Sequence, residues 1–207
     1  MGPQINKASS RSLFASFLLA AALAGALASS ACAGTPAYDY RKEPDPRNKE
    51  YEVGPLDQLK VVVWKNAELS ADVTVRPDGV VTLPLIGDVR AAGRTPSAIQ
   101  KEVSQRYSHY IRVEESVVNV GVTQVNSLNF SISGQVEKPG SYSVKSYVTV
   151  LEAIATAGGP NKYASNNIFV VRGQPSRKIP IDLKAASSGE HPEQNIVVLR
   201  GDLIVVP

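Results

Sequence analysis

The sequence is poor in the residues that most often build disulfides and metal sites. Its 207 residues include one cysteine and two histidines. One cysteine cannot form an internal disulfide, and neither His109 nor His191 has a second histidine or a cysteine at the spacing of metal ligands. We therefore expect no bound metal and no cofactor, and a fold that depends on packing or on assembly.

The chain also lacks a strong excess of charge. Its formal net charge is +3. Loss of Lys7 and Arg11 with the N-terminal segment considered below would leave 20 basic and 19 acidic residues. A nearly neutral surface gives no electrostatic reason to bind nucleic acid or to bind anionic membranes broadly.

The common catalytic motifs are missing as well. The sequence has no Gly-x-Ser-x-Gly motif and no phosphate-binding loop with a lysine after its second glycine. Asp57, Asp78 and Asp202 each lie within two residues of a glycine or proline near a predicted strand edge, where a carboxylate usually accepts backbone N–H bonds. Two of them acting on a glycoside would be the alternative, but nothing in the sequence brings a pair together. We expect no enzymatic activity.

The longest apolar run lies at the N-terminus. Lys7 and Arg11 precede a run from Leu13 to Leu27 that only Ser16 interrupts. A basic start followed by an apolar run is typical of a secretory signal peptide, and this run is shorter than the roughly 20 residues of a transmembrane helix. Residues 1–31 are predicted to be a signal peptide, so the mature chain is exported.

Cys32 follows this run after four small residues, Ala28 to Ala31. The segment "SSAC" resembles the end of a bacterial lipobox but has Ser29 where leucine is usual. Cleavage before Cys32 would make its thiol a lipid attachment point. Ordinary cleavage after Ala26-x-Ala28 or Ala31-x-Ala33 would leave no lipid. Lipidation of Cys32 is the expectation, because a lone free thiol would be a liability in an oxidising compartment.

Four segments are predicted along the chain. The signal peptide is followed by residues 32–49, which have three prolines after Cys32, many charges and no apolar periodicity, as in a flexible tether. Residues 50–126 and 127–207 then show short β-branched runs separated by glycine, proline and aspartate, which predict two small β-rich units.

The first unit is predicted to contain one helix among several strands. Pro77-Asp78-Gly79 predicts a turn that joins strands 71–75 and 80–87 as a hairpin. Thr95 and Pro96 are expected to begin a helix. Trp64 and Tyr107 could stack on sugar rings, but both stand in apolar patterns and are expected in the core. The predicted apolar helix face is Ile99, Val103, Tyr107 and Tyr110, and the other strands are 59–64 and 116–125.

The second unit is predicted to be a small β-grasp-like α+β domain. Thr149 and Glu152 form a capping box that begins a short helix, with Leu151, Ile154 and Ala155 as its buried face. Pro139-Gly140 predicts a type II turn with a positive φ at the glycine. The predicted strands are a run from residue 128 and the segments 141–144, 168–172, 178–183, 196–199 and 203–206.

Long ordered stretches of the chain resemble a known family. "YEVGPLDQLKVVVW" from Tyr51 and "VRPDGVVTLPLIGDVRAAGRTPSAIQKEV" from Val75 resemble the polysaccharide export domain of the Wza-type outer-membrane polysaccharide export proteins. "SGQVEKPGSYSV" from Ser133, "TVLEAIATAGGP" from Thr149 and the closing "RGDLIVVP" are similar to the soluble-ligand-binding β-grasp (SLBB) domain that follows it.

The resemblance implies a non-catalytic part of the conduit that exports capsule or exopolysaccharide. It implies a homo-oligomeric ring at the periplasmic face of the outer membrane, working with an inner-membrane polysaccharide co-polymerase. Longer members have a C-terminal amphipathic helix that assembles into a barrel across the outer membrane. This sequence stops at Pro207, so we expect it to form no transmembrane barrel. We expect a separate integral outer-membrane protein, a β-barrel, as its partner. A periplasmic module that binds a saccharide or small ligand is the alternative.

Overall fold

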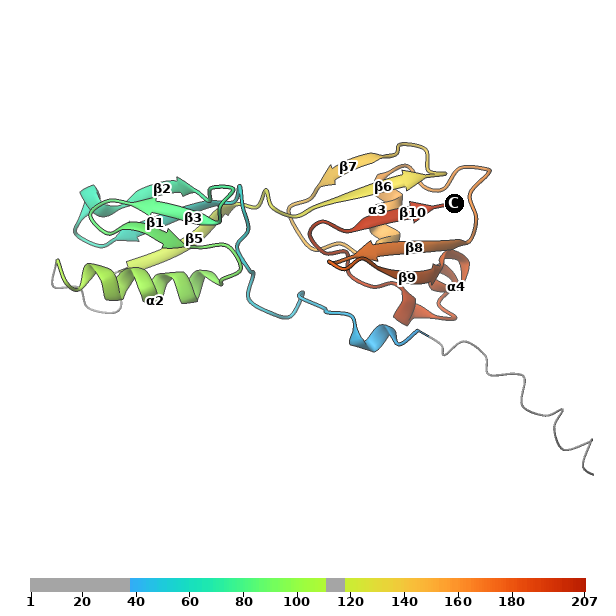
Figure 1. Ribbon diagram of the computed structural model, residues 1–207, viewed down its shortest axis with the longest axis horizontal. Helices are drawn as coiled ribbons and strands as arrows, with labels where there is room; N and C mark the ends of the chain where they lie inside the picture. The colour runs from blue at the N-terminus through green and yellow to red at the C-terminus, as the bar shows by residue number, and fades with distance from the viewer. Residues whose placement is uncertain (1–37, 111–117) are drawn as a thin grey trace, which may run out of the picture. The chain divides into compact units, whose positions relative to one another are not determined.

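The computed structural model describes residues 38–110 and 118–207, and Figure 1 shows their helices and strands. Cys32 and the predicted signal peptide lie outside these residues and stay predictions. The described residues form an α+β fold, as predicted, with three sheets and three α-helices. No helix in these two ranges combines the length and the apolar character needed to cross a lipid bilayer.

The first sheet is three-stranded and antiparallel, with β1 at its centre. Its strands are β1 (Gln58–Val63), β2 (Ala71–Thr74) and β5 (Val118–Gln124), in the order β2-β1-β5. Val61 pairs with Ala71 on one side and with Val120 on the other. Alternate side chains of β1 are buried, so one face of this sheet belongs to the core.

The hairpin in this half of the chain is not the one predicted. The turn at Pro77-Asp78-Gly79 forms, since the Gly79 N–H donates to the Arg76 carbonyl at 2.8 Å. However, β2 pairs with β1, whereas β3 (Val80–Leu83) pairs with β4 (Gly87–Arg90) in a two-stranded sheet. The predicted strand 80–87 thus ends at a second turn, where Leu85 has a φ of 66°. Sequence periodicity marks a strand but does not identify its partner.

Helix α2 (Pro96–Tyr107) begins as predicted. The Thr95 side chain accepts a hydrogen bond from the Ala98 N–H, and Pro96 occupies the first turn. Ile99, Val103 and Tyr107 are fully buried, but Tyr110 is 59% exposed because the helix ends at Tyr107. The prediction for Tyr110 is therefore wrong.

The first sheet, the hairpin β3–β4 and helix α2 share one hydrophobic core. Tyr107 closes it from the helix side, with its hydroxyl donating to the Pro84 carbonyl at 3.1 Å. Trp64, also expected in this core, is 66% exposed. Strand β1 ends at Val63, so Trp64 lies in the turn after the strand and outside the core. The buried members are Val53, Leu59, Val61, Val63, Leu69, Val75, Val81, Leu83, Val89, Ala91, Ile99, Val103, Tyr107, Val118 and Val120.

The second half of the chain contains a mixed five-stranded sheet in the order β7-β6-β10-β8-β9. Strand β10 pairs in parallel with β6 and antiparallel with β8. Pro180 lies in β9, an edge strand, where a residue without an N–H is tolerated. The strands are β6 (Asn129–Gly134), β7 (Gly140–Ser143), β8 (Asn167–Arg172), β9 (Arg177–Asp182) and β10 (Leu203–Val206).

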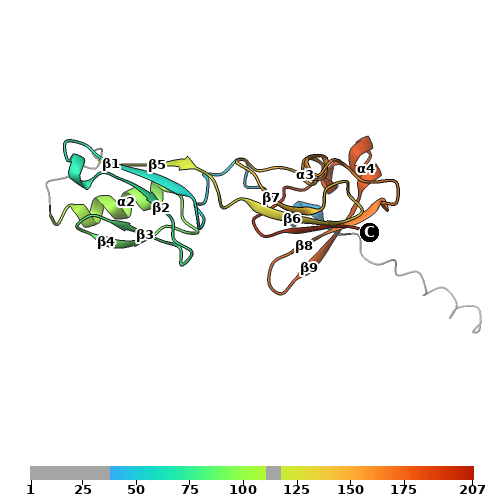
Figure 2. The same ribbon diagram turned by 90° about the horizontal axis from the view of Figure 1, so that it is seen from above.

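Helix α3 (Val150–Thr156) lies on one face of this sheet, as Figures 1 and 2 show. Both bonds of the predicted capping box between Thr149 and Glu152 are present. The buried face is shifted from the predicted one: Val150, Ala153 and Ile154 are buried, whereas Leu151 is half-buried and Ala155 is exposed. A seven-residue helix is too short for its spacing alone to fix the buried side.

Three further details of this half differ from the predictions. The predicted strand 178–183 ends at Asp182, which caps an unpredicted helix, α4 (Leu183–Ser188). Residues 196–199 are mostly buried but form no strand, with one isolated bridge between Val197 and Thr149. Gly140, predicted to have a positive φ after Pro139, has none, so that prediction is wrong; Gly134, the last residue of β6, has a φ of 95°.

Candidate binding site at the N-terminal leader

Residues 38–49, here called the leader, are part of the segment predicted as a flexible tether. The structure differs from that expectation, since Tyr40–Lys42 form a 3-10 helix, η1, capped by the Asp39 side chain. The Tyr40 hydroxyl donates to the Pro180 carbonyl of β9 at 2.5 Å. Glu43 is the one buried residue of the leader. A charged residue thus forms the innermost contact of a segment that has no apolar pattern.

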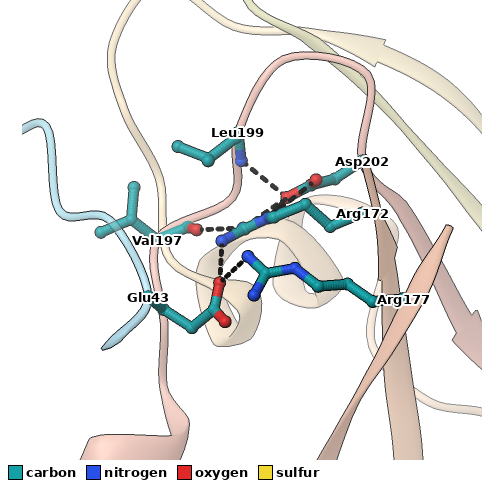
Figure 3. Close-up of polar contacts among 6 residues, drawn as sticks. All are labelled: Glu43, Arg172, Arg177, Val197, Leu199 and Asp202. Atoms are coloured by element: carbon teal, nitrogen blue, oxygen red, sulfur yellow. Dashed lines mark hydrogen bonds and ion pairs between the residues drawn. The ribbon is translucent and has the colours of Figure 1, made fainter. Parts of the chain in front are cut away.

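Glu43 is held by two arginines of the second half of the chain (Figure 3). Its Oε2 accepts from Arg172 Nη1 at 2.8 Å and from Arg177 Nη2 at 2.9 Å. The side chains of Glu43 and Arg172 are 2% and 6% exposed, whereas that of Arg177 is 50% exposed. The site is therefore closed on the side of Arg172 and open to solvent on the side of Arg177.

Arg172 has a second carboxylate partner, Asp202, also shown in Figure 3. Arg172 Nη2 donates to Asp202 Oδ2 at 2.6 Å, and Arg172 Nε lies 3.0 and 3.1 Å from the two Asp202 oxygens. Nη2 also donates to the Val197 carbonyl at 2.7 Å, and Asp202 accepts from the Leu199 N–H at 2.8 Å. All three guanidinium nitrogens of Arg172 thus have acceptors.

The β-sheet brings these groups together from distant parts of the sequence. Arg172 ends β8 and Arg177 begins β9, and the two residues are paired across these strands. Asp202 directly precedes β10, the other neighbour of β8. The sheet therefore fixes both arginines and Asp202, while Glu43 comes from a segment 129 residues before Arg172.

The charges of the site balance, with two carboxylates facing two guanidinium groups. Burial disfavours the charged form of Arg172, but the hydrogen bonds and charges of Asp202 and Glu43 outweigh it and raise the pKa of Arg172. Removing one partner from such a buried cluster leaves an uncompensated charge, which is costly. Loss of either carboxylate would therefore leave part of the charge of Arg172 uncompensated.

A surface pocket of about 310 Å³ adjoins this cluster. It lies between the leader and residues 192–197, and it shares Glu43 and Val197 with the cluster. Its lining combines apolar side chains with charged and amide groups: Tyr40, Arg41, Glu43, Pro44, Asp45, Arg47, Pro192, Glu193, Asn195, Ile196 and Val197. The leader is therefore incompletely packed against this half of the chain.

Asp57 forms the centre of a second buried polar cluster. It accepts backbone N–H bonds from Gly54 at 2.7 Å and from Asn126 and Ser127 at 2.8 Å each. The hydroxyl of Tyr51 also donates to it at 2.6 Å. Burial opposes ionisation, but these hydrogen bonds prevail and lower the pKa of Asp57, while burial and the bond to Asp57 raise the pKa of Tyr51 to about 12.

The predicted role of the three aspartates as acceptors of backbone N–H bonds holds at each position. Asp57 and Asp202 make such bonds as described above, and Asp78 accepts from the Val80 N–H at 3.4 Å and pairs with Arg76. No hydrogen bond or ion pair within the described ranges joins any two of them. The polar groups that a paired-carboxylate mechanism would use are instead engaged in local structure.

The two histidines have unrelated surroundings. His109 is exposed beyond the end of α2, and His191 Nδ1 lies 2.9 Å from the Glu193 carboxylate. Within residues 38–110 and 118–207, no three His, Cys, Asp or Glu side chains are grouped so that they could hold a metal ion.

Sequence reasoning missed Glu43, Arg172 and Arg177 as a group. A signal for Arg172 exists, because it continues the alternation of buried Ile168 and Val170 in β8. An arginine on the buried face of a strand requires an acceptor. Nothing in the leader distinguishes Glu43 from its exposed acidic neighbours, so its pairing could not be predicted.

Comparison with protein families finds two matches in this chain. Residues 45–123 match the model of the polysaccharide biosynthesis/export protein family, and residues 129–180 match that of the SLBB domain. These matches confirm the resemblance to the outer-membrane polysaccharide export family: the chain joins an export domain to an SLBB domain.

Several curated proteins are similar to parts of this chain. The exopolysaccharide production protein ExoF of Rhizobium meliloti is 32% identical over 123 residues, which cover 55% of this chain and 29% of ExoF. The capsule polysaccharide export outer membrane protein CtrA of Neisseria meningitidis is 29% identical over 140 residues, covering 65% and 33%. The EPS I polysaccharide export outer membrane protein EpsA of Ralstonia nicotianae is 23% identical over 180 residues, covering 75% and 47%. The matched region thus spans less than half of each of these relatives.

Proposed function

We propose that the chain is a non-catalytic component of a conduit that exports capsule or exopolysaccharide across the bacterial envelope. The observation that carries the proposal is the succession of an export-family match and an SLBB match along one chain. Relatives that share this region are named for polysaccharide export or production. The engagement of Asp57, Asp78 and Asp202 in local hydrogen bonds agrees with a role that needs no covalent step.

The proposed location is the periplasmic face of the outer membrane. Residues 1–31 would direct export, and a lipid on Cys32 would anchor the chain. Two relatives are named as outer membrane proteins. Their names support the proposed location at the outer membrane but say nothing about a lipid on Cys32. Mass spectrometry of the mature N-terminus tests the anchor: a diacylglyceryl group on Cys32 is expected, and an unmodified peptide that begins at Ser29 or Gly34 would contradict it.

The proposed working form is a homo-oligomeric ring. Its partners would be an inner-membrane polysaccharide co-polymerase and a separate integral outer-membrane protein that supplies the channel. The export unit is proposed to comprise residues 50–126 and the SLBB unit residues 127–207. Cross-linking in cells, followed by identification of the captured envelope proteins, tests these partners. One captured protein should belong to the inner membrane and one to the outer membrane.

A periplasmic module that binds a saccharide or a small ligand is the second candidate. The pocket of about 310 Å³ beside the leader favours it, since small-molecule sites begin near this size. The oligomeric state discriminates between the export conduit and the binding module. Light scattering on the purified mature chain is expected to give a ring-sized particle for the conduit. A stable monomer with saturable affinity for a saccharide would favour the binding module instead.

A further inference from the structure

We propose that Arg172 and Arg177 form a carboxylate-binding site which the leader occupies through Glu43, and that a carboxylated saccharide competes with Glu43 for it. The contact between Glu43 and these arginines then works as a clasp that ligand binding opens. The existence of a carboxylate site depends only on the geometry below, whereas the choice of a saccharide rests on the proposed role in polysaccharide export.

Glu43 is bound in the manner of a ligand. Of the residues from Tyr38 to Glu50, only Glu43 is buried, and helix η1 beside it contributes no buried side chain. Among the contacts described above, the leader meets the sheet through the carboxylate of Glu43 and the hydroxyl of Tyr40. Tyr38, Tyr40 and Pro46 are half-buried, and no apolar side chain of the leader is fully buried. A segment without a fully buried apolar side chain can be exchanged more easily than a packed one.

The receiving half of the site does not depend on Glu43. Asp202 and the Val197 carbonyl fix the guanidinium group of Arg172, and the Leu199 N–H holds Asp202. Arg172 and Asp202 both belong to the frame of the sheet. The donor Nη1 of Arg172 therefore keeps its position when Glu43 leaves, and a preorganised donor of this kind favours binding.

Departure of Glu43 changes the charge of the site. Arg172 and Arg177 would then face Asp202 alone, which leaves an excess of one positive charge and an unpaired, buried Arg172 N–H. Such a group is costly until a new acceptor arrives. A carboxylate meets the need best, because arginine binds it by charge and by matched hydrogen bonds. Half-exposed Arg177 provides the approach from solvent.

The adjoining pocket favours a carboxylate that is carried on a sugar ring. Its wall on the side of residues 192–197 combines the apolar side chains of Pro192 and Ile196 with the polar groups of Glu193 and Asn195. A sugar ring also presents apolar C–H groups together with hydroxyls. A uronic acid thus matches both the arginine pair and the wall beside it.

The test uses the purified mature chain with sodium glucuronate as the probe. Trypsin cleavage after Arg41, Lys42 and Arg47 reports release of the leader, because cleavage follows the population of the open form. Glucuronate is expected to speed this cleavage in the wild-type chain by about tenfold, corresponding to ~1.4 kcal/mol. Glucose lacks the carboxylate, and sodium chloride matches the ionic strength. Neither of these controls should speed cleavage.

The variant Glu43→Gln isolates the receiving site. Without ligand, the leader of Glu43→Gln should be cleaved as fast as that of the wild-type chain with glucuronate. The control Asp72→Asn, which changes an exposed acid of β2, should keep the wild-type rate. In Glu43→Gln, glucuronate should shift the NMR signal of the Arg172 Nε–H group. If this variant fails to fold, the effect of glucuronate on trypsin cleavage of the wild-type chain still decides the question.

Two results would overturn the proposal, and they do so in different ways. If glucuronate neither speeds cleavage of the wild-type leader nor shifts the Arg172 signal of the variant, no exchangeable carboxylate site exists. If sodium acetate acts as strongly as glucuronate, the site binds carboxylates in general, and the proposal of a saccharide ligand is wrong. Both experiments use purified protein without export machinery, so their failure is separate from failure of the export function.

Discussion

The Asp57 carboxylate accepts hydrogen bonds from both the backbone N–H and the hydroxyl of Ser127, at 2.8 and 2.9 Å. Asp57 precedes β1 and Ser127 follows β5, so this contact closes a loop of 70 residues in sequence. Both residues are buried. The ionised carboxylate of Asp57 thus holds the chain in place where it leaves the first sheet after β5.

Replacing Asp57 by asparagine should destabilise the protein strongly. The amide would place an NH₂ group where several N–H donors converge, so that buried donors lose their acceptor. We expect a loss of about 2–3 kcal/mol in the free energy of unfolding, measured by urea titration with circular dichroism. Asp72→Asn, at an exposed position, should stay within about 0.5 kcal/mol of the wild type. Equal losses in the two variants would contradict this role of Asp57.

The effect of Asp57→Asn should depend on pH. The pKa of Asp57 is lowered from 3.8, so its ionised form adds stability above that value and loses it as the pH falls through the folded-state pKa. The difference in unfolding free energy between wild type and variant should therefore be constant near neutral pH and shrink below pH 3.8. A difference that stays constant down to the acid unfolding of both proteins would show that Asp57 does not titrate as described.

Replacing Gly134 by alanine should destabilise the second sheet. Gly134 has a φ of 95°, and a β-carbon there would lie 2.0 Å from the carbonyl oxygen of Val206 on the parallel strand β10. We expect a loss of about 2 kcal/mol or more in the free energy of unfolding. Gly140→Ala is the matched control, since that position has no positive φ and no atom within 4 Å of the added carbon. Equal stability of the two variants would contradict the need for glycine at position 134.

Replacing Thr149 by alanine should loosen the start of helix α3. The Thr149 side chain caps this helix, and its backbone N–H donates to Glu152 at 2.7 Å. Loss of the cap should cost about 1 kcal/mol and speed amide hydrogen exchange in the first turn of the helix. Thr156→Ala removes a threonine hydroxyl at the exposed other end of the helix and should leave exchange in the first turn unchanged.

The single tryptophan offers a check on the corrected position of Trp64. With 66% of its surface exposed, the indole should emit like a hydrated one and should be quenched readily by iodide. Trp64→Ala should change the free energy of unfolding by about 0.5 kcal/mol or less, because it leaves no cavity in the core. A blue-shifted emission protected from iodide would show that Trp64 belongs to the core.

Local sequence signals predicted local structure well and pairing poorly. Thr95 with Pro96 and Thr149 with Glu152 identified the starts of α2 and α3, because capping involves residues at most three or four positions apart. The pairing of β2 with β1 and of β3 with β4 depends on contacts between strands, which periodicity does not encode. The exposure of Trp64 follows from the end of β1 at Val63, and the apolar run "VVVW" does not show where the strand ends.

The candidate site was hidden from sequence reasoning for a related reason. Asp202 was predicted to accept a backbone N–H and does so from Leu199, but its ion pair with Arg172 arises from the neighbouring strands β8 and β10. Glu43 stands in a charged, proline-rich segment that normally indicates solvated chain. Its partners Arg172 and Arg177 lie 129 and 134 residues further along the chain, so its buried position depends on contacts distant in sequence.

Export of polysaccharide by the living cell tests the central claim most directly. A strain that makes the polymer and lacks this chain should lose the polymer from its surface and medium while polymer accumulates inside the envelope. The wild-type chain should restore export, and so should the Asp72→Asn variant. The measurement is the amount of polymer outside the cells relative to that retained. Unchanged external polymer in the deletion strain, with none retained, would contradict the account.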